Sequence, residues 1–145
     1  MARNQKDFTF DSDLELKDAG LIAADAAAQV DSAAKVLDLG LARVDGRVIV
    51  DVTVIEVADN DERYFVRTQF SDDAFAASIV GGTVLELGAL EITDAEVDTP
   101  IGRYELPFTN EINGITYRYM RIFTAVEGTV GTGINYIAFA VLGVR

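Results

Sequence analysis

Acids, glycines, tyrosines and arginines are the residues of this chain that could do chemistry, because histidine and cysteine are both absent. Without them the chain cannot build a Ser-His-Asp or Cys-His catalytic site, a cysteine zinc site or a disulfide framework. The chemistry that remains is that of paired carboxylates, a lysine nucleophile, or a hard cation held by oxygen ligands. Four groups of residues have suitable types and spacing for such roles or for binding.

The segment Gly128-Thr-Val-Gly-Thr-Gly133 has glycine spacing similar to that of a phosphate-binding loop. A true phosphate loop lies between a strand and a helix, and it carries Lys followed by Ser or Thr. Here a strand pattern follows, and the segment has no Lys. We therefore interpret it as a hairpin turn, in which the glycines supply positive backbone angles.

The segment Asp59-Asn-Asp-Glu62 is acidic and is a candidate for metal binding. The chain has 24 acidic residues in total, so pairs of carboxylates are also candidates for acid–base catalysis. The segment lacks the Gly at position six and the Glu at position twelve of an EF-hand calcium loop, so we interpret it as a solvated turn. Two carboxylates could also form a glycosidase site, but tryptophan, the usual sugar-stacking residue, is absent. We expect no catalytic residue, no cofactor and no metal, and hence a protein that is not an enzyme.

Tyr117, Arg118, Tyr119 and Arg121 form a cluster with the composition of a protein interface, in which Tyr and Arg are enriched. On a strand, Tyr117, Tyr119 and Arg121 would share one face, and Arg118 would point to the other. Two interpretations stay open: an interface, or tyrosines that belong to the core with arginines extending to its rim.

The polar segment 1–7 carries Arg3 and Lys6 and is predicted to be a flexible arm in front of one domain at residues 8–145. The arm is either a tether that adds a strand to a partner's sheet or an ordinary frayed terminus. Arg3 and Lys6 join Tyr117, Tyr119 and Arg121 as the candidate interface residues.

The formal net charge is −12, which disfavours nucleic acid and anionic membranes as partners, because both require Lys and Arg. The charge favours solubility and a basic partner surface. Residues 1–98 hold 21 acids against 8 basic residues, so the negative charge lies in the first two thirds of the chain. No segment approaches the roughly 18 apolar residues of a membrane span, and the start of the chain lacks a signal-peptide pattern, so we expect a cytosolic origin.

Apolar residues follow the two-residue period of strands through most of the chain. Val48, Val50, Val52 and Val54 alternate strictly, and the apolar phase switches at Ile55, which predicts a bulge or a sharp bend. Other predicted strands cover residues 8–16, 64–70, 83–92, 103–108, 116–126 and 134–142. The last two are apolar on both faces, which indicates a second burial surface such as a subunit interface.

Turn signals separate these strands. Asp45-Gly46 and Asn113-Gly114 are hairpin signals, Pro107 indicates an edge strand or a bulge, and residues 93–99 are predicted to form an acidic loop. Ser71-Asp-Asp-Ala-Phe75 is similar to a helix N-terminus, capped by Ser71 and stopped by Gly81-Gly82.

Residues 19–39 are rich in alanine but lack a wide apolar stripe, so we expect mostly extended structure with at most one helical turn. About eight antiparallel strands with short turns and no long helix predict an all-β, single-domain sandwich or jelly roll.

Three segments carry a family resemblance. They are Lys17-Asp-Ala-Gly-Leu-Ile-Ala-Ala-Asp-Ala-Ala-Ala-Gln-Val30, Gly40-Leu-Ala-Arg-Val-Asp-Gly-Arg-Val-Ile-Val-Asp-Val52 and Gly102-Arg-Tyr-Glu-Leu-Pro-Phe-Thr-Asn-Glu-Ile-Asn-Gly-Ile-Thr-Tyr-Arg-Tyr-Met-Arg-Ile122. In these segments the chain resembles the cement proteins of short-tailed phage heads, of the kind found in Bordetella phage. The likeness runs from about residue 8 to residue 139. It implies a small jelly roll that oligomerises on the outside of the capsid, bridges major capsid proteins and has no catalytic residues.

The leading hypothesis is therefore a capsid cement protein, made in the host cytoplasm and located on the outer surface of the virion. Its expected partners are further copies of itself, with a dimer favoured over a trimer, and the phage major capsid protein. A carbohydrate- or receptor-binding jelly roll displayed on a virion is one alternative, and an acidic DNA mimic that inhibits a host protein is another.

Overall fold

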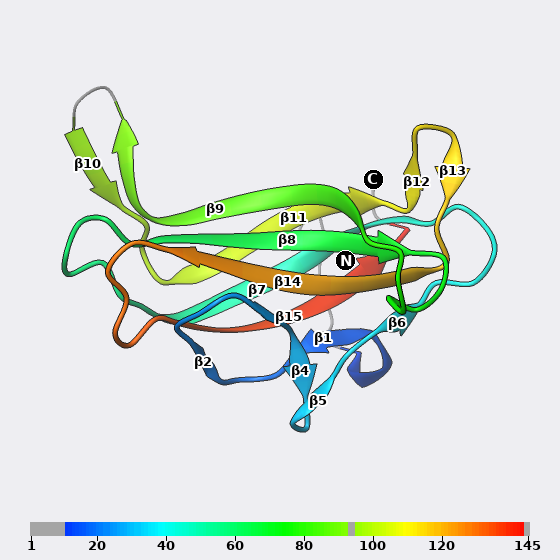
Figure 1. The fold of residues 1–145 in the computed structure, drawn as a ribbon, viewed down its shortest axis with the longest axis horizontal. Coiled ribbons are helices and arrows are strands. Elements are labelled where there is room, and N and C mark those ends of the chain that lie inside the picture. Colours follow the sequence, from blue (N-terminus) through cyan, green and yellow to red (C-terminus); the bar gives the residue numbers. More distant parts are fainter. Residues whose placement is uncertain (1–10, 93–94, 144–145) are drawn as a thin grey trace, which may run out of the picture.

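The computed structural model describes residues 11–92 and 95–143, and almost every regular element in them is a strand (Figure 1). The short elements at the start are η1 (Ser12–Leu14), β1 (Glu15–Lys17), β2 (Leu21–Ile22), β3 (Ala26–Ala27), β4 (Gln29–Val30), β5 (Ala33–Ala34) and β6 (Leu37–Asp38). The later elements are β7 (Asp45–Ile55), β8 (Arg63–Ser71), β9 (Val80–Ile92), β10 (Ala95–Asp98), β11 (Gly102–Thr109), β12 (Glu111–Ile112), β13 (Ile115–Thr116), β14 (Tyr119–Glu127) and β15 (Ile134–Leu142). No helix of the described residues is long and apolar enough to cross a membrane.

The long strands form two antiparallel sheets in the order of a jelly roll, and β4-β5 and β12-β13 form two small separate sheets. One sheet reads β1-β15-β7-β11, and the other reads β3-β14-β8-β9 with β10 beyond β9. β7 and β8 lie in opposite sheets, as do β14 and β15, whereas the consecutive strands β8 and β9 pair within one sheet (Figure 1). Two four-stranded layers connected in this way form the double Greek key of a jelly roll. The predicted all-β sandwich is confirmed, and because many functions share this architecture, the fold alone does not identify one.

The core lies between the two sheets and is built from alternate residues of the long strands. Val48, Val50 and Val52 of β7 point inward and are at most 4% exposed, and Tyr64 and Val66 of β8 are fully buried. The other large side chains that fill the core include Leu16, Phe70, Leu87, Met120, Ile122, Ile134 and Tyr136. The alternation predicted from the sequence is confirmed for β7 and β8.

A bulge explains the phase switch at the end of β7. Asn135 and Tyr136 are consecutive in β15 but pair with Val54 and Val52, so Thr53 is the extra residue on β7. Even-numbered valines point inward before the bulge, whereas beyond it Val54 is 40% exposed. The bulge predicted from the sequence is confirmed, and it bends the strand at the corner of the sandwich.

Several turn predictions are also confirmed. The described residues of 19–39 are extended or form short turns, and Asn113-Gly114 connects β12 to β13 with φ of 52° and 78°. Pro107 lies in β11, which is the last strand of its sheet. The predicted strand at 8–16 is shorter than expected, because η1 precedes β1 and residues 8–10 lie outside the described ones.

The predicted short helix at Ser71-Asp-Asp-Ala-Phe75 is wrong, although Ser71 does act as a cap. Its Oγ accepts the N–H groups of Asp73 at 3.1 Å and Phe75 at 2.9 Å. The chain then continues as a loop, because Ala74 and Phe75 have left-handed φ angles of 56° and 66°. Gly81-Gly82 does not stop a helix but lies inside β9, and the predicted acidic loop at 93–99 contains β10, which pairs with β9.

The Asp45-Gly46 turn prediction is wrong as well, since both residues lie inside β7. Gly46 is needed there for space: a Cβ atom would collide with the carbonyl oxygen of Val141 on β15 and lie 3.1 Å from the ring of Phe108 on β11. The glycine thus allows close approach of neighbouring strands, a role that a local dipeptide signal does not distinguish from a turn.

We predict that Gly46→Ala lowers the free energy of unfolding by about 1–3 kcal/mol, because the added methyl group overpacks the junction of three strands. Urea denaturation followed by circular dichroism measures this change. Gly81→Ala is the matched control, since a Cβ atom at that position in β9 meets nothing within 4 Å. Equal stability of the two variants would contradict the packing role of Gly46.

Candidate functional site

The glycine-rich segment 128–133 is already occupied by a carboxylate of the same chain. The N–H groups of Gly131, Thr132 and Gly133 donate to Glu56 Oε1 at 2.9, 2.8 and 3.0 Å. These bonds, led by that from Gly133, hold the pKa of Glu56 below its ordinary value. The predicted hairpin turn is corrected, because the segment joins strands of opposite sheets. Its amides do form an anion-binding arrangement, and Glu56 is the anion that fills it.

The acidic turn at 59–62 is also held by bonds within the chain. Glu62 is fully buried, and its carboxylate accepts the N–H groups of Asp59 and Asp61, each at 3.1 Å. Asp61 accepts the N–H of Thr129 at 3.0 Å and its hydroxyl at 2.8 Å, which lowers the pKa of Asp61. The turn and the 128–133 segment are therefore one hydrogen-bonded unit.

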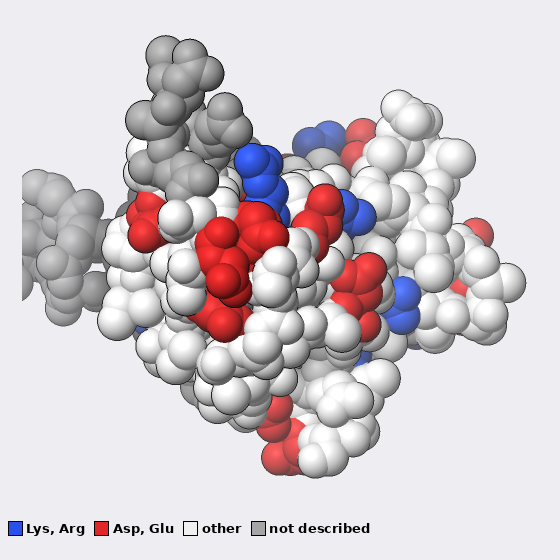
Figure 2. All heavy atoms as spheres, turned by 60° about the vertical axis from the view of Figure 1, so that its left-hand side comes forward, with Lys and Arg blue, Asp and Glu red and all other residues white. Residues whose placement is uncertain are grey.

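This unit lies at an end of the sandwich where Asp and Glu side chains are prominent (Figure 2). Within the described ranges, no group of three or more acidic side chains is arranged to hold a metal ion. Glu56, Asp61 and Glu62 accept backbone N–H groups instead. What these acids do in the folded protein is fasten loops.

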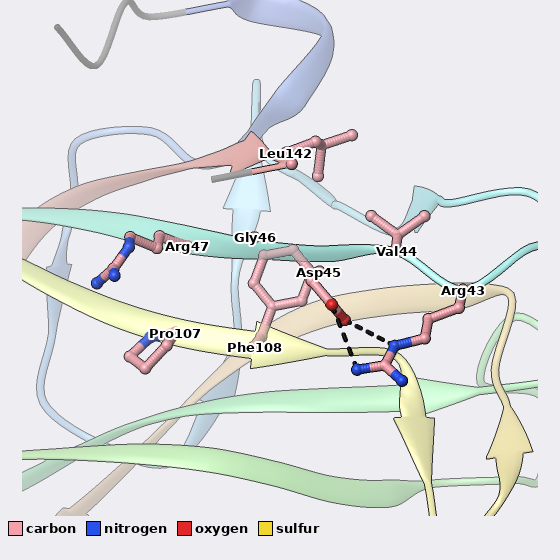
Figure 3. A pocket seen from close by; sticks show the side chains of 9 residues that line it. Arg43, Val44, Asp45, Gly46, Arg47, Pro107, Phe108 and Leu142 are labelled. Atoms are coloured by element: carbon pink, nitrogen blue, oxygen red, sulfur yellow. Dashed lines mark hydrogen bonds and ion pairs between the residues drawn. The ribbon is translucent and has the colours of Figure 1, made fainter. Parts of the chain in front are cut away.

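An open groove of about 900 Å³ lies at the opposite end of β7 (Figure 3). Phe108 forms one wall, and the two arginines at the groove are paired with acids. Arg43 pairs with Asp45 at 3.1 Å and with Glu111 at 3.4 Å, and Arg47 pairs with Glu105 at 3.4 Å. The groove offers contact area to a ligand, with its cations already matched by carboxylates.

Lys17 is the lysine with the most perturbed environment among the described residues. It is 3% exposed, and burial lowers its pKa to about 8. Its Nζ donates to the carbonyl oxygens of Asp18, Gly20 and Tyr136 at 2.9, 3.1 and 2.7 Å and lies 4.5 Å from the centre of the Tyr136 ring. All three donors of the ammonium group are used, so this lysine ties the turn after β1 to β15.

The outer face of the β8–β14 sheet carries arginine and aromatic side chains side by side. Alternate residues of these strands fill the core, so those between them point outward. The pairing places Phe123 beside Arg67, and Arg121 beside Gln69. We call this surface the arginine–aromatic face, and its members are Phe65, Arg67, Gln69, Phe75, Val84, Tyr119, Arg121 and Phe123.

Arg121 is held between two aromatic rings of this face. Its guanidinium carbon lies 4.3 Å from the ring centre of Phe75 and 6.0 Å from that of Phe123. Its Nε donates to Gln69 Oε1 at 2.8 Å. Burial in this setting lowers the pKa of Arg121, and no carboxylate of the described residues forms an ion pair with it.

Arg67 has a similar setting one strand away. Its guanidinium carbon lies 5.4 Å from the ring centre of Phe65. Its Nε is buried and has no hydrogen-bond partner, and none of the described acids forms an ion pair with the side chain. On the same strand Arg63 does pair with an acid, Glu86, at 3.1 Å, so the lack of a carboxylate is specific to this part of the face.

The loop after β8 holds Phe75 over Arg121. Ser71 accepts the N–H of Phe75 and donates its hydroxyl to the Asp73 carboxylate at 2.7 Å, which also accepts the N–H groups of Ala77 at 3.0 Å and Ser78 at 3.2 Å. These bonds, led by that from the Ser71 hydroxyl, lower the pKa of Asp73. Phe75 itself has a left-handed φ of 66°. Non-glycine residues seldom adopt this conformation unless their surroundings enforce it, and such positions cluster at binding sites.

The structure separates the predicted interface residues. Tyr119 and Arg121 lie on the outer face of β14, as expected from the alternation. The prediction that Tyr117 shares this face is wrong, because β14 begins only at Tyr119; Tyr117 packs against the core and its N–H donates to Asn110 O at 2.8 Å. Arg118 pairs with Asp38 at 2.8 Å.

Arg3, Lys6 and the predicted arm at 1–7 lie outside the described residues. The site prediction includes only Tyr119 and Arg121 of the arginine–aromatic face and misses its other six members: Phe65, Arg67, Gln69, Phe75, Val84 and Phe123. The alternation of residues 63–69 indicates which side chains of β8 point outward. No local sequence signal indicates that β8 pairs with β14. Comparison with protein-family models and with curated proteins finds no match to this chain.

We predict that Glu56→Gln makes the amides of Gly131, Thr132 and Gly133 exchange with deuterium several-fold faster, because a neutral acceptor binds them less strongly than a carboxylate. The folded-state pKa of Glu56 is lowered, so its contribution is complete above the ordinary value of 4.5 and is lost as the pH falls through the lower folded-state value. The wild-type amides should therefore lose protection on acidification, and those of the variant much less. Glu127→Gln, at the end of β14, is the control; equal exchange in both variants would argue against the clamp.

Proposed function

We propose that this protein is a capsid cement, or decoration, protein that binds the outer surface of a phage head and bridges major capsid proteins. The observation that carries the proposal is the arginine–aromatic face. It combines the residue types that dominate protein interfaces, Arg and aromatics, on a rigid sheet. The segment resemblance to phage cement proteins supports the same function.

The fold suits a role that depends on contact area. A standard interface buries roughly 800 Å² per partner, and one outer face of a sandwich is large enough to supply such an area. Repetition of the contact over a closed shell adds avidity, so each contact can be individually weak. Bridging of neighbouring capsid proteins would then resist the outward pressure of packaged DNA.

A carbohydrate- or receptor-binding jelly roll displayed on the virion is the second candidate, and the groove beside Phe108 favours it. An open groove of about 900 Å³ with an aromatic wall and polar neighbours could hold part of a glycan. Specific binding on a glycan array, without affinity for phage heads, would support this candidate over the cement function.

The cement function predicts saturable binding of the purified protein to undecorated heads of short-tailed phage. Bound heads should release their DNA at a higher temperature than bare heads, because each bridge must break before the shell opens. Co-sedimentation measures the binding, and DNA-dye fluorescence on heating measures the release. Heads that take up no protein and melt at an unchanged temperature would refute the function.

We further predict that the protein is an oligomer in solution, with a dimer preferred to a trimer, as the apolar outward positions of β15 indicate. Ile137 and Val141 alternate with the core residues of this strand and are only partly buried. Multi-angle light scattering at micromolar concentration gives the molar mass. A value equal to that of one chain, 15.7 kDa, would contradict the prediction.

A further inference from the structure

The arginine–aromatic face holds two cations that the chain's own described acids leave unmatched. Five arginines of the described residues form ion pairs, namely Arg43, Arg47, Arg63, Arg103 and Arg118. Arg67 and Arg121 form none with described acids, in a chain that has twice as many acids as basic residues. A protein with this excess of carboxylates has left unmatched two arginines on one face.

The two arginines are close neighbours. Phe123 is directly opposite Arg67, and Gln69 is directly opposite Arg121, so the arginines occupy diagonal positions on adjacent strands. Diagonal neighbours of an antiparallel pair are about 7–8 Å apart at Cα and within reach of long side chains. Two like charges at this distance repel each other, and a carboxylate placed between them would be attracted by both.

Arg121 is already ordered for such a contact. The rings of Phe75 and Phe123 and the Gln69 amide hold its guanidinium through the ring faces and Nε. The terminal nitrogens form no hydrogen bond with the other described residues. A guanidinium edge is the group that receives a carboxylate with two parallel bonds. Because the side chain is held before binding, little further conformational entropy is lost on docking.

We propose that this face docks a carboxylate-bearing extended segment of another protein, with the acids at Arg121 and Arg67 and apolar neighbours on Phe65, Phe123 and Val84. Val84 is 50% exposed at the edge of the patch. In the cement function, the segment belongs to the capsid surface, and only this identification of the partner rests on that proposed function.

Charge excludes two other occupants. A second copy docked through the same face about a two-fold axis would bring together two surfaces that both carry unmatched arginines, because an isologous contact pairs a surface with itself. A polyanion such as nucleic acid would be repelled by the net charge of −12, which two local arginines do not offset. A single acidic segment needs no more positive charge than the face provides.

The first experiment is an NMR titration of the full chain with the blocked peptide acetyl-Ala-Glu-Leu-Glu-Ala-amide and with its Gln-for-Glu counterpart. The Nε–H signals of Arg121 and Arg67 should shift saturably with the Glu peptide, and the Gln peptide should bind at least about tenfold more weakly because it lacks the charge. Equal affinity for the two peptides would overturn the proposal. So would equally strong binding of inorganic phosphate at these signals, or shifts there that depend only on protein concentration, which would indicate a second copy.

Variants test the residues. Arg121→Ala and Arg67→Ala should each weaken Glu-peptide binding several-fold, and Arg121→Lys should recover only part of it, because lysine keeps the charge without the two-bond edge. Arg103→Ala is the matched control: this arginine pairs with Asp51 at 2.7 Å on the outer face of the other sheet. Unchanged binding by the first two variants, or an equal loss in the control, would overturn the assignment.

Binding of the same variants to undecorated phage heads separates this inference from the cement function. If wild type binds heads and Arg121→Ala binds them equally well, the face is not the docking surface although the cement function stands. If wild type binds the Glu peptide but no heads, the docking inference stands and the cement function fails. The expected result is that the variants lose affinity for heads and peptide together.

Discussion

The bond between Glu56 and the amides of residues 131–133 is the contact on which the crossing between the two sheets depends. β14 and β15 lie in opposite sheets and must be joined across a layer about 10 Å thick. The amides of such a connection have no neighbouring strand to bind, and unpaired amides are costly. Glu56 follows β7 directly and supplies one carboxylate oxygen to three of them. Its own carbonyl accepts the hydroxyl of Tyr64 at 2.8 Å, which anchors the clamp in the core.

Hydrogen bonds from backbone N–H groups to carboxylates occur in several other parts of the molecule, and they account for part of the acidic composition. Asp25 accepts the N–H of Val126 at 2.7 Å, Asp18 accepts that of Asp31 at 2.8 Å, and Asp73 accepts those of two residues in its loop. Several of the acids thus serve as acceptors for backbone N–H groups of the chain. The net charge of −12 is therefore weaker evidence for a basic partner than the sequence suggests. The charged side chains that indicate a binding surface are those that form no hydrogen bond or ion pair of this kind within the chain.

The sequence predicted the parts of the fold that depend on side-chain alternation, including β8, the valines of β7 and the bulge near its end, because burial of one strand face imposes a two-residue period. The sequence-based prediction failed where the role of a residue depends on strands that are distant in the chain. The Asp45-Gly46 pair has the composition of a turn, but the space that Gly46 leaves is needed by Phe108 and Val141. Extension of the two-residue period to residues before the start of β14 wrongly places Tyr117 on the face of Tyr119. Most of the arginine–aromatic face is missed for a related reason, since β8 and β14 are far apart in the chain and only their pairing brings Arg67 beside Phe123.

The two outer faces of the sandwich differ, and this difference bears most directly on function. On the β7–β11 side, Arg103 binds both oxygens of Asp51 at 2.7 and 2.8 Å, and Arg47 pairs with Glu105, so described cations and acids neutralise one another. On the β8–β14 side, Arg67 and Arg121 lie among aromatic rings without such partners. Burying a cation without a carboxylate costs free energy, and holding Phe75 at a positive φ adds backbone strain. Neither feature helps the isolated chain to fold. An acidic partner of the kind proposed above would supply the missing carboxylates, and the strained loop has already positioned the ring that orders Arg121.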